Sequence, residues 1–194
     1  FVIERFSPID EELEIVAIDQ WNNESKKLVK VIVKSKKNTA RIVEKLDPSK
    51  IRSKDSPNKV AIIIGIQDYV NSPKASYANL DAEYFNEYVK RGFGVRDENI
   101  KLLIDNKATR SNYEETLLLW LPNKIKKNVT ELIIFYSGHG LGTPDGKELY
   151  LLAHDSKTEE VLLPSTALLR SKLIKEISNL KPKSVTLFFD TCYS

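Results

Sequence analysis

The residues of this sequence best suited to covalent chemistry are one cysteine and one histidine. Cys192 is the only cysteine in the chain, and His139 lies between Gly138 and Gly140. A cysteine attacks as its thiolate, which requires a base within hydrogen-bonding reach, and the flanking glycines let the backbone beside His139 turn sharply. The pair therefore predicts acyl transfer through a cysteine nucleophile. The alternative is a buried Cys192 that acts as a small apolar side chain, with His139 in an ordinary loop.

The elements that must position these two residues predict an α/β fold with a mostly parallel sheet flanked by helices. Strand-like apolar runs alternate with segments of helical spacing, which favours strand–helix–strand units. We expect strands at 60–64, 100–104, 132–136 and 185–189, a short extended piece at 149–152, and helices at 77–90, from an N-cap at Ser111 to 121, and at 165–180. His139 follows the third strand and Cys192 the fourth. Ligands gather at the carboxyl ends of parallel strands, so the two residues are predicted to meet at one edge of the sheet.

Residues 1–58 differ from the rest and predict a β-rich N-terminal segment with a linker. Apolar and polar residues alternate at 13–18 and 28–33, which is typical of antiparallel strands joined by a polar turn at 22–25. A polar stretch with two prolines follows at 47–58 and predicts a linker. The sequence therefore predicts two parts, residues 1–58 and 59–194.

Composition excludes several classes of protein. Hydrophobic residues make up 41% of the 194 residues, enough for a packed core, so the chain is not wholly disordered. One cysteine excludes an internal disulfide and a cysteine-cluster zinc site. With 30 basic and 27 acidic residues the net charge is +3, and no basic stripe predicts binding to nucleic acid. No apolar run approaches the roughly 18 residues that a membrane span requires.

Two segments of the chain resemble the large catalytic subunit of the caspase-like cysteine peptidases. The segments are Phe135-Tyr136-Ser137-Gly138-His139-Gly140 and Val185-Thr186-Leu187-Phe188-Phe189-Asp190-Thr191-Cys192. The histidine precedes the cysteine by about 50 residues, which is the caspase order. The resemblance covers residues 59–194 and is closer to bacterial caspase-like proteins and metacaspases, since animal caspases have Gln-Ala where this chain has Asp190-Thr191. It implies the three-layer caspase–hemoglobinase fold.

The resemblance implies roles for particular residues. His139 and Cys192 match the catalytic dyad, and the backbone N–H groups of Gly140 and Cys192 match the oxyanion hole. Asp81 and Asp190 match the metacaspase pocket carboxylates, which imply cleavage after Arg or Lys, and Ser137 matches a pocket serine. The chain departs from the family at position 78, where an alanine stands in place of a pocket cysteine.

The resemblance also implies partners. We expect a protein or peptide substrate and no required cofactor or metal, with calcium activation left open through acidic residues near Asp155. In this family a small subunit follows the nucleophile and completes the cleft, so we expect this large-subunit part to pair with the chain's own C-terminal segment.

Two alternatives stay open at this point. One is a non-catalytic caspase-like interaction module, and the other is a gingipain-like or separase-like peptidase. The chain has no methionine, so we expect that residues before Phe1 are missing. The compartment therefore stays open between a bacterial cytoplasm and export.

Overall fold

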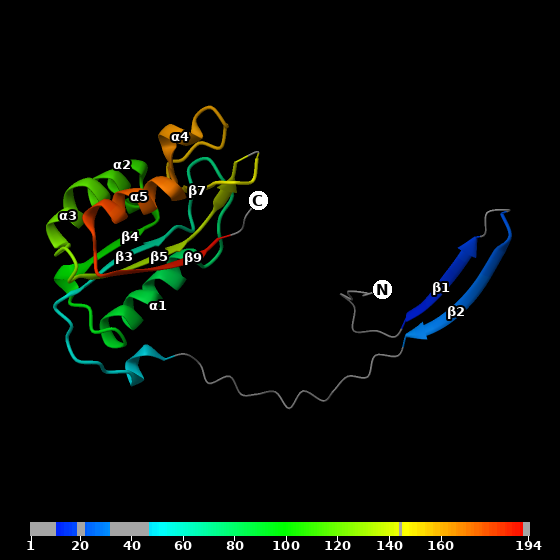
Figure 1. Ribbon diagram of the computed structural model, residues 1–194, viewed down its shortest axis with the longest axis horizontal. Helices are drawn as coiled ribbons and strands as arrows, with labels where there is room; N and C mark the ends of the chain where they lie inside the picture. The colour runs from blue at the N-terminus through cyan, green and yellow to red at the C-terminus, as the bar shows by residue number, and fades with distance from the viewer. Residues whose placement is uncertain (1–10, 19–21, 32–46, 144, 192–194) are drawn as a thin grey trace. The chain divides into compact units, whose positions relative to one another are not determined.

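The computed structural model describes residues 11–18, 22–31, 47–143 and 145–191. The chain divides into two compact units, residues 1–45 and residues 46–194, and Figure 1 shows the elements of each. The functional boundary between residues 58 and 59 stays a prediction. Among the described residues, no helix is long and apolar enough to cross a membrane.

The first unit contains an antiparallel hairpin, formed by β1 (Glu11–Ile18) and β2 (Glu24–Val31). In the backbone register Leu13 lies opposite Val29 and Glu12 opposite Lys30. The alternation thus predicts both strands correctly, although β2 begins at Glu24, inside the stretch predicted as a turn.

The second unit is built on a four-stranded parallel sheet. Its strands are β3 (Lys59–Gly65), β4 (Ile100–Ile104), β5 (Glu131–Ser137) and β9 (Ser184–Asp190). Their order in the sheet is β4-β3-β5-β9. The two central strands, β3 and β5, are buried apolar runs, as expected for strands covered on both faces. The strands that precede His139 and Cys192 are neighbours, as the sequence predicts.

Helices cover both faces of this sheet, as Figure 1 shows. They are α1 (Ala78–Arg91), α2 (Arg110–Glu115), α3 (Leu121–Lys124), α4 (Leu163–Thr166) and α5 (Arg170–Leu180). On one face Ile63 and Phe135 pack against Val89 of α1. On the other face Ile62 packs in a cluster with Leu173 of α5. The predicted α/β fold, a mostly parallel sheet between helical layers, is confirmed.

A small antiparallel sheet lies beyond the carboxyl end of β5. It contains β6 (Gly140–Gly142), β7 (Leu149–Leu152) and β8 (Ala167–Leu169), in the order β6-β7-β8. The prediction of one helix over 165–180 is therefore wrong. Residues 167–169 pair with β7, and Ala167 and Leu168 are buried there, so tertiary packing overrides the helical preference of Ala and Leu.

The helix predicted from Ser111 begins earlier and is not uniform. Its N-cap is Thr109, whose Oγ1 accepts a hydrogen bond of 3.2 Å from the N–H of Asn112, so the prediction of Ser111 as N-cap is wrong. A π-helical turn over Thr116–Trp120 separates α2 from α3. Pro122 lies just beyond it and cannot donate into a regular helix, which accounts for the widened turn.

Candidate active site

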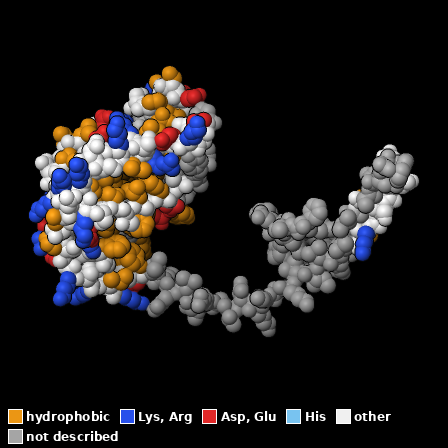
Figure 2. Space-filling model, viewed as in Figure 1, with side chains coloured by type: hydrophobic (Ala, Val, Ile, Leu, Met, Phe, Trp, Pro, Cys, Tyr) orange, Lys and Arg blue, Asp and Glu red, His pale blue; other side chains and the backbone are white. Residues whose placement is uncertain are grey.

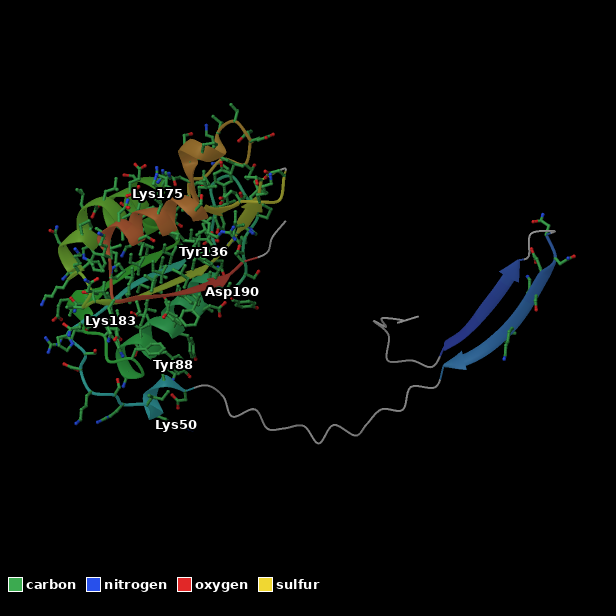
Figure 3. The ribbon with its side chains drawn as sticks, viewed as in Figure 1. Lys50, Tyr88, Tyr136, Lys175, Lys183 and Asp190 are labelled. Atoms are coloured by element: carbon green, nitrogen blue, oxygen red, sulfur yellow. The ribbon has the colours of Figure 1, made fainter. Side chains whose placement is uncertain are left out.

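His139 lies at the carboxyl edge of the main sheet, two residues after β5 ends at Ser137. Its side chain is half-buried and its ring lies beside that of Tyr69, with centroids 4.9 Å apart and planes inclined by 37°. Figure 3 shows Tyr136 and Asp190 toward this same end of the sheet, and Lys183 toward the other. The candidate histidine is therefore at the edge that the sequence predicts.

A backbone carbonyl fixes which nitrogen of His139 carries hydrogen. Nε2 lies 2.9 Å from the carbonyl oxygen of Pro73. A carbonyl oxygen can only accept, so Nε2 is the donor in this contact, and in neutral imidazole the lone pair then belongs to Nδ1. The sequence did not predict the role of Pro73. The contact is made by its backbone carbonyl, which every residue type has.

The loop between β3 and α1, which carries Pro73, is held by side chains from neighbouring elements. Oδ1 of Asp105 accepts hydrogen bonds from the N–H groups of Gln67 at 2.7 Å and Asp68 at 3.0 Å. The N–H of Ala75 donates to the carbonyl of Gln67 at 2.9 Å, which closes the loop around Pro73. The carbonyl that meets His139 is thereby held from both sides.

The predicted nucleophile, Cys192, lies outside the described residues, but the strand that leads to it is described. β9 lies beside β5 in parallel register, and Asp190 pairs with Ser137. His139 and Cys192 each follow this paired position by two residues. This register brings the carboxyl ends of β5 and β9 side by side at the sheet edge.

The predicted pocket residues gather on the face of the sheet that α1 covers. Asp81 lies in the first turn of α1 and Asp190 ends β9. Partial desolvation and then the negative charge of Asp190 raise the pKa of Asp81 above its ordinary value. Ser137 is 3% exposed beside Asp190, and Ala78, at the start of α1, is 4% exposed.

Gly140 begins β6, where it pairs with Leu151. The chain after His139 thus joins the small antiparallel sheet. The backbone of His139 therefore links β5 of the main sheet to β6 of the small one. Tyr69 lies beside that backbone, a contact that sequence reasoning missed. The sequence did contain a signal for it, since Tyr69 follows the first strand of the sheet at the edge where ligands gather.

The second histidine has a structural contact. Nδ1 of His154 lies 2.6 Å from the carbonyl oxygen of Asp68. Nearby, Oδ1 of Asp155 accepts a hydrogen bond of 2.8 Å from the N–H of Arg110. In the part of the chain that the structure describes, no group of three or more His, Cys, Asp or Glu residues could hold a metal ion.

Comparison with known proteins identifies the family. Residues 58–194 match the caspase domain, a family of peptidases, and the chain belongs to this family. A similar solved structure is the crystal structure of protein GSU0716 from Geobacter sulfurreducens, with a TM-score of 0.54 and 19% identity. The match covers 70% of this chain and 51% of that one, and at this identity it shows the fold alone. No curated protein matches the sequence.

Proposed function

We propose that this protein is a cysteine endopeptidase that hydrolyses peptide bonds after Arg or Lys, with His139 and Cys192 as its catalytic dyad. The observation that carries the proposal is the register of β5 and β9, in which the two residues follow one paired position by equal offsets. Membership of a peptidase family supports the same chemistry.

The contact between His139 and Pro73 suits the histidine for acid–base work. With Nε2 donating to the Pro73 carbonyl, Nδ1 is the nitrogen that takes the thiol proton of Cys192. The resulting imidazolium keeps the Pro73 carbonyl as a hydrogen-bond acceptor on Nε2. A backbone carbonyl thus does for this histidine what a carboxylate does in a triad, without adding a negative charge.

The reaction proceeds in two acyl-transfer steps. The thiolate of Cys192 attacks the substrate carbonyl carbon and forms a C–S bond, while the N–H groups of Gly140 and Cys192 donate to the oxyanion. The C–N bond breaks as His139 gives its proton to the leaving amine. Water then gives a proton to His139 and attacks the thioester, which releases the carboxylic acid and returns the thiol.

Specificity rests on the two carboxylates beside Ser137. Asp81 and Asp190 interact through their charges, so a cationic side chain between them relieves their repulsion and gains charge-assisted hydrogen bonds. A substrate aspartate would add a third negative charge there, and we expect it to be rejected.

The chain's own C-terminal small-subunit segment is proposed as the structural partner. Within the described residues β9 pairs only with β5, and Val185 and Phe188 of β9 are 40% and 39% exposed. Figure 2 shows hydrophobic side chains at the surface on the face of this unit that carries β9. A further strand would pair with this edge and cover them.

The proposal is tested with the full-length protein on fluorogenic peptides ending in Arg, Lys or Asp, with and without calcium. We expect cleavage after Arg and Lys and its loss in the Cys192→Ala and His139→Ala variants. Cleavage after Asp would keep the dyad but contradict the roles of Asp81 and Asp190. Absence of cleavage under every condition, including after limited proteolysis, would favour a non-catalytic interaction module.

A further inference from the structure

The side chain of Tyr69 contacts His139 in two ways. Its hydroxyl oxygen accepts a hydrogen bond of 2.8 Å from the backbone N–H of His139. Its ring lies 4.9 Å from the imidazole, centroid to centroid. Tyr69 therefore contacts both the backbone of His139 and its imidazole ring.

A second phenol holds the other end of the same peptide unit. The hydroxyl of Tyr136 lies 2.6 Å from the carbonyl oxygen of His139 and 2.9 Å from that of Leu152, and it can donate to one of them at a time. Burial raises the pKa of both phenols, so both remain neutral at physiological pH.

Gly138 shows how closely the phenols approach the chain. Its φ is 154°, and a Cβ at this position would collide with the hydroxyl of Tyr69 and come within 3.1 Å of the hydroxyl of Tyr136. The glycine before His139 is thus required by the phenols as well as by the backbone angle.

We propose that Tyr69 is a positioning residue for His139, whose hydroxyl and ring hold the imidazole with Nε2 on Pro73 and Nδ1 toward the nucleophile. The proposal rests on the function proposed above, since it assigns the residue that holds the base of that dyad. Tyr69 does not touch the reacting atoms and acts only through His139.

The physical reason lies in how little else restrains the imidazole. Among the described residues, its ring makes a hydrogen bond with the Pro73 carbonyl and a ring–ring contact with Tyr69. Removing the Tyr69 hydroxyl leaves the part-buried backbone N–H of His139 without its acceptor. The Tyr69 ring, which packs beside the imidazole, also loses the hydrogen bond that holds it in place. A displacement of about 1 Å at a catalytic group can lower the rate by about 100-fold, so we expect a rate effect with little change in substrate binding.

The test compares Tyr69→Phe with the unchanged full-length protein. We expect kcat for an Arg peptide to fall by about 10- to 100-fold, with KM within about twofold. The matched control is Tyr84→Phe, because Tyr84 is 59% exposed on α1, and kcat should not change there. Thermal melting of each variant shows whether the fold is retained at the assay temperature.

A second readout needs no peptide substrate. Cys192 is the only cysteine, so the rate of iodoacetamide alkylation reports its thiolate directly. In the unchanged protein we expect alkylation to persist at pH 6 through the pairing with His139, and in Tyr69→Phe the rate at pH 6 should fall relative to that at pH 9. Tyr136→Phe removes the donor to the carbonyl oxygens of His139 and Leu152 but leaves Tyr69 in contact with the N–H and ring of His139, so it should have a smaller effect in the same direction.

The possible results separate the two proposals. Unchanged kcat and unchanged alkylation in Tyr69→Phe would overturn the positioning role while leaving the dyad intact. Equal losses in Tyr69→Phe and Tyr84→Phe would overturn it as well. If the unchanged protein alkylates like an ordinary thiol, and His139→Ala does not alter the profile, the dyad itself fails and the positioning role with it.

Discussion

At the scale of single residues, the candidate site relies on backbone groups and phenols to direct a histidine. The carbonyl of Pro73 selects the donor nitrogen of His139, and the hydroxyl of Tyr69 holds its N–H. The nearby carboxylates of Asp81 and Asp190 are proposed to bind the substrate and not to orient the histidine. The negative charge of Asp190 helps to raise the pKa of Asp81, and two such carboxylates suit a cationic ligand.

The electrostatic coupling of these carboxylates gives a pH-dependent prediction. Since burial and Asp190 raise the pKa of Asp81, acidification neutralises Asp81 at a higher pH than an ordinary aspartate. As the pH falls through the raised pKa of Asp81, kcat/KM for Arg peptides should therefore decrease. In Asp190→Asn the charge is gone, the pKa of Asp81 drops, and the acid limb should move to lower pH.

The measurement is kcat/KM for an Arg peptide from pH 4 to 8 in both proteins, with Asp97→Asn as a control. Asp97 is paired with Lys90 at 2.8 Å, on another part of the unit, and its change should leave the limb in place. An acid limb that does not move in Asp190→Asn would contradict the coupling. KM should rise in that variant at every pH, because one of the two carboxylates is lost.

At the scale of elements, the sequence predicted what local patterns determine and missed what tertiary pairing determines. The continuous apolar run of β3 and the helical spacing of α1 locate both elements to within a residue or two. The Ala167–Leu169 segment has helix-forming residues, yet it pairs with β7. Pairing partners distant in the chain leave no local pattern, and neither does the carbonyl of Pro73.

The contact between α1 and β3 gives a prediction at this scale. A Cβ on Gly65 would collide with the Cβ of Ala82 and lie 2.5 Å from the carbonyl oxygen of Ala78. Gly65→Ala must therefore push α1 off the sheet, and we expect a loss of about 3 kcal/mol and a Tm lower by about 10 °C.

Gly146→Ala is the matched control for this change. Nothing lies within 4 Å of a Cβ at Gly146, although its φ is 68°, so only backbone strain of about 1 kcal/mol is expected. Melting curves of the two variants decide the matter. Equal losses of Tm would show that close packing of α1 on β3 is not what requires glycine at position 65.

At the scale of the whole molecule, the described sheet ends in a strand that is only partly covered. β9 pairs with β5 alone among the described residues, and Val185 and Phe188 are exposed on it. Exposed edge strands pair with other chains unless charge or a further strand prevents it. The resemblance to the caspase-like peptidases implied this edge from the sequence, because in that family a further part of the sheet follows the nucleophile.

We therefore expect the 194-residue chain to self-associate through β9 and Val185→Lys to reduce that association. Ile174→Lys is the control, because Ile174 of α5 is 42% exposed, close to the 40% of Val185, and it lies on a helix. Light scattering across a concentration series measures the effect. A similar reduction by both variants would point to general hydrophobic contact and not to the strand edge.

The central claim is that Cys192 and His139 act together on substrates with a basic residue, and covalent labelling tests it most directly. The full-length protein and its His139→Ala variant are treated with peptidyl chloromethyl ketones ending in Arg or in Asp, and peptide mapping by mass spectrometry locates the adduct. We predict that the Arg reagent labels Cys192 in the unchanged protein, that the Asp reagent does not, and that His139→Ala loses the labelling. Equal labelling by both reagents, or labelling that persists unchanged in His139→Ala, would contradict the account.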